Sequence, residues 1–127
     1  MHPRKFFYRE LHYFGHEVLL RSTKNGLVGE IVAMDGSDLP RSVIFKNVDW
    51  ANFCSATDDL VVGPSDEDLS VQDGFEVECH ISFYRTRFNF LIMNPSSQDF
   101  LALRAAVNEI STSADCPQGM LDMHFEV

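Results

Sequence analysis

The middle of this sequence lacks positive charge. No lysine or arginine lies between Lys46 and Arg85, whereas nine acidic residues lie between these two cations. A long acidic stretch repels nucleic-acid phosphates and anionic membrane surfaces, so the composition argues against both as partners and favours basic proteins or cations. The nine acids are Asp49, Asp58, Asp59, Asp66, Glu67, Asp68, Asp73, Glu76 and Glu78.

Cysteine is scarce, and long apolar runs are missing. The three cysteines, Cys54, Cys79 and Cys116, form an odd number without a repeated spacing, which is not typical of a secreted disulfide scaffold. No run approaches the roughly 18 apolar residues that span a bilayer. The first ten residues contain cations but no uninterrupted apolar segment of the signal-peptide kind. We therefore expect a soluble, cytoplasmic protein with no membrane partner.

Motifs that would name a reaction or a cofactor are also missing. The sequence contains no GxGxxG, no phosphate-binding P-loop and no GxSxG. Cys79 and His80 are adjacent, but neighbouring strand residues point to opposite faces and cannot form a catalytic pair. We predict a core thiol at Cys79. A nucleophilic Cys54 or Cys116 that uses a distant histidine is the alternative, and we expect no enzyme, no catalytic residue and no cofactor.

Two patterns suggest metal ligands only weakly. His12 and His16 have the spacing of a helical metal pair, but no third ligand is evident and Gly15 weakens a helix there. Packed or solvated histidines are the better interpretation. We therefore predict no metal site at these residues.

The second pattern is the start of a calcium-binding loop at Asp66, Asp68 and Ser70. Val71 and Val77 stand where such a loop requires glycine and glutamate. A solvated acidic loop over residues 65–74 is the better interpretation.

What the sequence does contain is enough apolar material for one domain. It has 127 residues, of which 45% are hydrophobic and eleven are phenylalanine. A chain of this length buries a core without disulfides or metals, so we expect a single globular domain over residues 1–127. The first 24 residues carry five cations and two acids, although the whole chain has a net charge of −9.

Two segments are typical of β-hairpins. Residues 17–34 contain Asn25-Gly26, the preferred central pair of a type I′ turn. Residues 75–93 alternate apolar and polar side chains on both sides of a turn at Arg85-Thr86. The predicted cross-strand pairs are Arg21–Glu30, Leu20–Ile31 and Leu19–Val32 in the first hairpin, and Phe83–Phe88, Ile81–Phe90 and Cys79–Ile92 in the second.

The remaining segments complete a mixed pattern. We predict strands at residues 42–47, 60–62 and 121–127. We predict a helix over 97–110, where Phe100, Leu103, Val107 and Ile110 form an apolar stripe and Ser96 with Asp99 resembles a capping box. Residues 5–14 suit either a helix or a strand. We favour a helix because Phe7, Leu11 and Phe14 have helical spacing, with Gly15 as its end.

This order of elements predicts an α+β fold. Hairpins outnumber crossover units, so the sheet should be mainly antiparallel, with the late helix covering one face and a short final strand. A roll or partly open barrel is the expected form, and a pleckstrin-homology-like shape is one instance of it. Such an analogy concerns topology alone, because a fold does not determine a function.

The second hairpin also carries two candidate sites. His80 shares the polar face of its strand with Glu76 and Glu78, and nearby carboxylates favour a protonated imidazole, so this spot is a candidate pH-sensitive site. Residues 85–90 mix cations with aromatic residues, as RNA-binding proteins do. Phe88 and Phe90 are needed in the apolar row, however, and we expect no nucleic-acid partner.

These observations favour a non-catalytic protein that binds and neutralises a basic protein partner, as inhibitors, immunity proteins and antitoxins do. Trp50, Tyr84 or exposed phenylalanines would be its anchors. One alternative is a small-ligand-binding or catalytic β-roll with a site near His80. Another is a self-assembling structural subunit, such as a homodimer formed through the tail strand or the polar sheet face. The candidate partner-binding residues are Asp58, Asp59, Asp66, Glu67, Asp68, Asp73, Glu76, Glu78, His80 and Tyr84.

Overall fold

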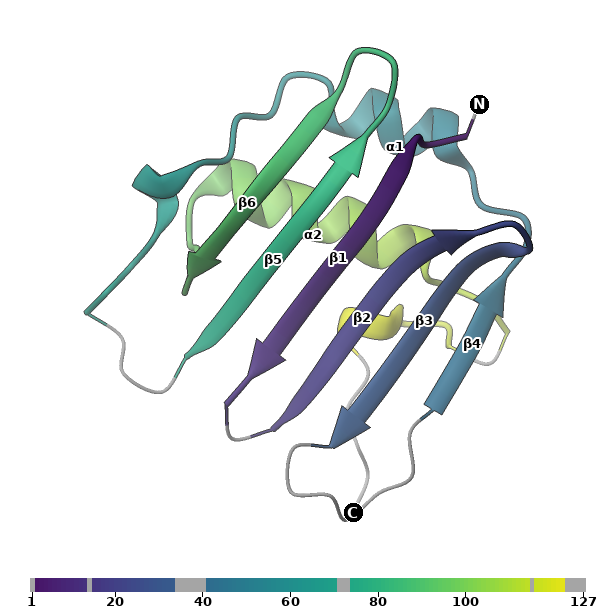
Figure 1. Cartoon of the computed structure of the whole chain (residues 1–127), viewed down its shortest axis with the longest axis horizontal. Helices are drawn as coiled ribbons and strands as arrows, with labels where there is room; N and C mark the ends of the chain where they lie inside the picture. Colours follow the sequence, from purple (N-terminus) through teal and green to yellow (C-terminus); the bar gives the residue numbers. More distant parts are fainter. Residues whose placement is uncertain (1, 14, 34–40, 71–73, 115, 123–127) are drawn as a thin grey trace.

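The protein is an α+β fold with one antiparallel sheet and two helices on the same face of it (Figure 1). The computed structural model describes residues 2–13, 15–33, 41–70, 74–114 and 116–122. The strands are β1 (Lys5–His12), β2 (His16–Thr23), β3 (Gly26–Ala33), β4 (Arg41–Phe45), β5 (Phe75–Ser82) and β6 (Arg87–Met93), and the helices are α1 (Trp50–Thr57) and α2 (Gln98–Ile110). Short 3₁₀ turns lie at Pro64–Asp66 and Met120–Asp122.

The strand order is β4-β3-β2-β1-β5-β6, and every neighbouring pair is antiparallel. This confirms the predicted class, a mainly antiparallel sheet with a C-terminal helix against it. The sheet is open, with β4 and β6 as its edges, and the late helix α2 shares the covered face with α1. The core lies between this face and the helices, while the opposite face of the sheet carries no helix (Figure 1).

The helix favoured for residues 5–14 is wrong, because Lys5–His12 form the central strand β1. The inner row of β1 consists of Phe6, Tyr8 and Glu10, all of them buried. Because Glu10 is charged, the inner row of β1 does not show the alternation of apolar and polar residues that identifies a strand. Phe14 lies outside the described residues.

The hairpin of β2 and β3 exists, but its predicted register is wrong by two residues. Thr23 faces Gly26, so Lys24 and Asn25 form the turn, and Leu19 rather than Arg21 faces Glu30. The Thr23 hydroxyl fixes the turn: it accepts a hydrogen bond from the Asn25 amide and donates one to the Gly26 carbonyl. A slip of two residues keeps each side chain on its own face, which is why the apolar pattern did not exclude it.

The hairpin of β5 and β6 shows the same two-residue difference. Ile81 faces Phe88 and Cys79 faces Phe90, because the loop spans residues 83–86 and is closed by a hydrogen bond from the Phe83 amide to the Thr86 carbonyl. Phe83 leaves the strand to pack against aromatic rings of α1. Its ring centroid lies 5.9 Å from that of Trp50 and 5.7 Å from that of Phe53.

Three smaller predictions are also corrected. The segment from Leu60 to Val62 is not a strand, and the preceding helix α1 was not predicted at all. Helix α2 is present with its stripe buried, but its N-cap is Ser97, whose hydroxyl accepts a hydrogen bond from the Phe100 amide, rather than Ser96. Of the predicted tail strand, Leu121 and Asp122 belong to a 3₁₀ turn, and residues 123–127 lie outside the described part.

Candidate partner-binding surface

A negatively charged segment runs along the outer edge of the sheet beside β6, after α1 has ended (Figure 1). We call residues 58–69 the acidic strap. Its carboxylates belong to Asp58, Asp59, Asp66, Glu67 and Asp68. Asp73, the remaining candidate of this region, lies outside the described residues.

The strap is attached to the end of β6 through its own carboxylates. Glu67 Oε1 accepts a hydrogen bond of 2.8 Å from the Met93 amide, and the Asp68 amide donates one to the Met93 carbonyl. Asp66 Oδ2 accepts from the Gly63 amide at 2.7 Å. The expected solvated loop is therefore corrected: the side chains of residues 66–68 are half-buried, and all three accept hydrogen bonds from backbone amides. Charge reversal at these three residues would remove the hydrogen bonds and disturb the fold, whereas charge reversal in a simple exposed loop would not.

Asn94 joins the strap to the start of β5. Its side-chain oxygen accepts from the Phe75 amide at 2.7 Å, and its side-chain nitrogen donates to the Asp68 carbonyl at 3.2 Å. Asn94 has a positive φ of 50°, a conformation that asparagine tolerates better than most residues. Gly74 allows this arrangement, since a Cβ atom at Gly74 would lie 1.4 Å from the Asn94 side-chain oxygen. The strap is thus a fixed element and not a loose loop.

The strap carboxylates have no compensating cation. None of the five forms an ion pair with any residue in the described ranges. The acids that follow on β5 differ, because each contacts a basic side chain on the uncovered sheet face. Glu76 contacts Arg9 Nη1 at 3.3 Å, and Glu78 contacts His80 Nε2 at 3.0 Å. These two acids therefore have basic partners, whereas the strap carboxylates have none among the described residues.

Two apolar side chains of the strap are exposed beside its carboxylates. Val61 and Leu69 are each 77% exposed, more than the other large aliphatic residues of the described ranges. The Val61 amide donates a hydrogen bond of 2.9 Å to Asp99 at the start of α2, which fixes the position of Val61. The strap thus combines an uncompensated negative charge with two accessible apolar contacts.

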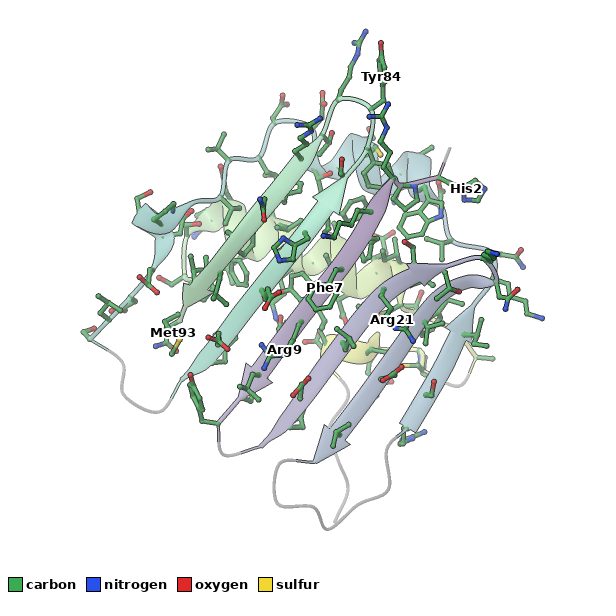
Figure 2. All side chains as sticks on the ribbon, viewed as in Figure 1. His2, Phe7, Arg9, Arg21, Tyr84 and Met93 are labelled. Carbon is green, nitrogen blue, oxygen red and sulfur yellow. The ribbon has the colours of Figure 1, made fainter. Side chains whose placement is uncertain are left out.

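The two predicted aromatic anchors have different environments. Trp50 is only 7% exposed and its ring packs against Phe6 at 5.2 Å, so its prediction as a surface anchor is wrong. Tyr84 is 81% exposed at the tip of the β5–β6 hairpin, where it points away from the molecule (Figure 2). The Arg85 guanidinium lies 5.9 Å from the centre of the Tyr84 ring, so this tip is positively charged and does not extend the acidic strap.

His80 lies on the uncovered sheet face beside a small hollow. Glu78 and Asn89 contact its two ring nitrogens. The hollow measures about 200 Å³ and is bordered by Lys5 and Arg87. Ligand pockets generally measure roughly 300–1,000 Å³, so the hollow is small for a substrate site. His80 and the strap carboxylates are on different surfaces.

A charged cluster that the sequence did not predict is buried under the helices. Glu10 is fully buried and receives hydrogen bonds from the Tyr8 hydroxyl at 2.6 Å and from Arg104 Nε at 2.8 Å, while His12 Nε2 lies 3.0 Å from its second oxygen. Burial, the largest effect, raises the pKa of Glu10, but the hydrogen bond with His12 and the charge of Arg104 outweigh it, so the pKa lies below the ordinary value. Arg104 also binds Asp122, which ties the 3₁₀ turn at 120–122 to the sheet.

The carboxylate of Glu10 is fully occupied by these donors, so the cluster acts as a structural anchor and offers no free base. The only sign of this cluster in the sequence is that Glu10 occupies an inner position of β1, and that position can be recognised only once β1 is known to be a strand.

The cysteines are poor nucleophiles. Burial raises the pKa of the Cys79 and Cys116 thiols, and both side chains are inaccessible. This confirms the predicted core thiol at Cys79. For Cys54, burial and the charge of Asp58 raise the pKa of the thiol. A raised thiol pKa reduces the thiolate fraction that nucleophilic catalysis needs.

His12 and His16 are on neighbouring strands and not on a helix, with ring centroids 5.0 Å apart. Within the described residues, no group of three or more histidine, cysteine or acidic side chains is arranged to hold a metal ion. No helix in that part of the chain is long and apolar enough to cross a membrane.

Comparisons with protein-family models, with curated protein sequences and with solved structures returned no match to this chain.

Proposed function

We propose that this protein is a non-catalytic binding domain that engages a basic protein partner through the acidic strap. The observation that supports the proposal is the uncompensated charge of Asp58, Asp59, Asp66, Glu67 and Asp68 along one edge of the sheet. A field of one sign speeds the encounter with a partner of the opposite sign and orients it. Neutralisation or regulation of that partner, as by an inhibitor, immunity protein or antitoxin, is the proposed consequence.

The two exposed aliphatic residues, Val61 and Leu69, add apolar surface that a partner can bury, which charge alone does not provide. Interfaces generally draw their affinity from a few desolvated contacts near their centre, while the charges set the rate and the orientation. Val61 and Leu69 are the proposed anchors, and the strap carboxylates are the proposed rim. Because hydrogen bonds of Glu67 and Asp68 to Met93 and Asn94 hold the strap, the surface is preorganised, which reduces the entropic cost of binding.

A capture experiment tests the proposal with matched variants. The full chain is immobilised and exposed to lysate of its source organism at low and at high salt. The paired variant Asp58→Asn/Asp59→Asn removes two exposed strap charges that make no hydrogen bond in the described part of the chain. The control Glu30→Gln/Glu109→Gln removes two carboxylates elsewhere and so changes the net charge equally.

The expected result is a basic protein that the wild type and the control retain at low salt and release at high salt. The strap variant should retain much less of it. Retention by the strap variant at the wild-type level would contradict the proposal, as would the absence of any salt-sensitive partner. In the latter case, a mass near twice that of the chain in solution would direct attention to self-assembly.

A further inference from the structure

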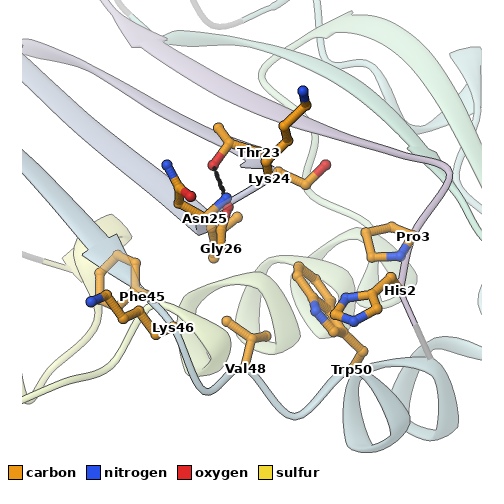
Figure 3. A pocket seen from close by; sticks show the side chains of 12 residues that line it. His2, Pro3, Thr23, Lys24, Asn25, Gly26, Phe45, Lys46, Val48 and Trp50 are labelled. Carbon is orange, nitrogen blue, oxygen red and sulfur yellow. Dashed lines mark hydrogen bonds between the residues drawn. The ribbon is translucent and has the colours of Figure 1, made fainter.

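A cavity lies at the opposite side of the sheet from the strap, between the β2–β3 turn and the segment that leads into α1 (Figure 3). It measures about 560 Å³, within the range of roughly 300–1,000 Å³ that small-molecule pockets occupy. The turn forms one wall. Val48 and Trp50, from the segment that leads into α1, line the wall opposite the turn. His2 and Pro3 line the side next to Trp50 (Figure 3). The cavity shares no residue with the strap.

The turn is fixed in place over this cavity. Gly26 has a φ of 125°, and a Cβ atom there would lie 2.5 Å from the Phe45 carbonyl oxygen. The hairpin therefore approaches β4 more closely than any other residue type at position 26 would allow. Together with the Thr23 hydroxyl contacts, this approach makes the wall a preformed surface.

The charge of the cavity is opposite to that of the whole protein. Lys24 and Lys46 line it, and no aspartate or glutamate does. Neither lysine forms an ion pair with a residue in the described ranges, although the chain has nearly twice as many acids as lysines and arginines. Both lysine side chains are exposed, and their ammonium groups point away from Trp50 (Figure 3), so the two charges lie at the rim of a partly open cavity, where they attract an anion.

The other lining atoms add a flat apolar wall and further donors. The rings of Phe45 and Trp50 and the side chain of Val48 line the space. The indole N–H of Trp50 and the side-chain amide of Asn25 make no hydrogen bond to the described residues, so these donors are available to a ligand. A few polar groups beside apolar walls are the usual composition of a ligand pocket.

We propose that this cavity binds a small organic anion with a planar apolar body. The planar part would lie against Trp50 and Val48, and its carboxylate or phosphate would lie at the rim, within reach of the exposed side chains of Lys24 and Lys46. The inference is independent of the proposed partner-binding function, because it uses a separate surface of opposite charge.

Trp50 provides a direct readout, because it is the only tryptophan in the chain and gives a single indole N–H signal in a ¹⁵N-correlated NMR spectrum. Phenyl phosphate is the probe. Phenol, which lacks the charge, and inorganic phosphate, which lacks the ring, are its matched controls. We expect a saturable shift of the indole signal with phenyl phosphate and a much weaker response to either control.

The charge contribution is tested with Lys24→Glu/Lys46→Glu, and the control Lys5→Glu/Arg85→Glu changes the net charge equally at exposed sites outside the cavity. The first variant should bind phenyl phosphate about tenfold more weakly or worse, and the second nearly as well as wild type. The same spectra report whether each variant is folded. The proposal is overturned if phenyl phosphate gives no saturable shift, if phenol binds equally well, or if both variants lose affinity to the same extent.

Discussion

The buried pair of Glu10 and Arg104 is the residue-scale feature on which the fold depends most. A buried carboxylate is tolerated only when donors replace the lost water, and Glu10 obtains these from Tyr8, His12 and Arg104. Arg104 comes from α2 and Glu10 from β1, so the pair joins the helix layer to the centre of the sheet. Through Asp122, it also positions the turn that follows α2.

The first prediction concerns Arg104→Met. This change leaves Glu10 buried without its main cationic partner, so we expect a loss of about 3 kcal/mol in the free energy of unfolding, at the lower end for buried pairs because Arg104 is partly exposed. Urea denaturation measures it. The double variant Glu10→Gln/Arg104→Met should be more stable than Arg104→Met alone, since no buried charge remains. A loss below about 1 kcal/mol in the single variant would contradict this role.

The second prediction is the pH dependence that follows from Glu10. Its pKa in the folded protein lies below the ordinary value of 4.5, so ionised Glu10 contributes stability that is complete above pH 4.5. That contribution is lost as the pH falls through the lower folded-state pKa. We expect the free energy of unfolding of Glu10→Gln to fall less steeply than that of the wild type below pH 4.5. Parallel curves over that range would show that Glu10 is not the coupled group.

At the scale of elements, the acidic strap depends on Asn94 as well as on its own carboxylates. Asn94 connects β6, the start of β5 and the strap through both ends of its amide. Gly74 leaves room for this amide, and the positive φ of Asn94 turns the chain away from the sheet. The attachment of the strap is therefore determined where β6 ends and β5 begins.

The third prediction concerns Asn94→Ala. The change removes two hydrogen bonds and places alanine at a positive φ, so we expect a loss of about 2 kcal/mol in the free energy of unfolding. Amide hydrogen exchange should become faster at Phe75 and Asp68. Asn94→Gly separates the two causes, because it relieves the backbone strain and still lacks the amide. Unchanged exchange at Asp68 in both variants would show that Asn94 does not hold the strap.

The same elements explain what could be predicted from the sequence. Alternation predicted β5, β6 and the apolar stripe of α2, because every inner position there is apolar. It failed in β1, where the inner Glu10 looked like a surface residue. Both hairpins were placed two residues away from their true register, since such a slip keeps all faces and only local contacts such as those of Thr23 and Phe83 decide it.

The candidate surface was also predicted only in part, because the sequence shows where the acids are but not which side chains they contact. Composition located the acids, but only the structure separates Glu76 and Glu78, which contact Arg9 and His80 on the sheet face, from the strap. Partners such as Arg9 are more than sixty residues away in the sequence, and no local pattern reveals such a pairing. The exposure of Val61 was hidden too, because short aliphatic runs usually indicate buried strands.

At the scale of the whole molecule, the chain has two surfaces of opposite charge. The strap on the β6 side is negative, the cavity beside the β2–β3 turn is lined by two lysines, and none of these charged groups forms an ion pair within the described residues. The net charge of −9 therefore does not describe either surface well. Basic macromolecules are expected at the first surface and small anions at the second.

The most direct test of the central claim is the rate at which the captured basic partner associates with the wild type and with Asp58→Asn/Asp59→Asn, measured by stopped flow across a salt series. We expect the variant to associate several-fold more slowly at low salt and its rate to depend less on ionic strength, while the control Glu30→Gln/Glu109→Gln stays close to wild type. Equal rates and equal salt dependence for the wild type and the strap variant would contradict it.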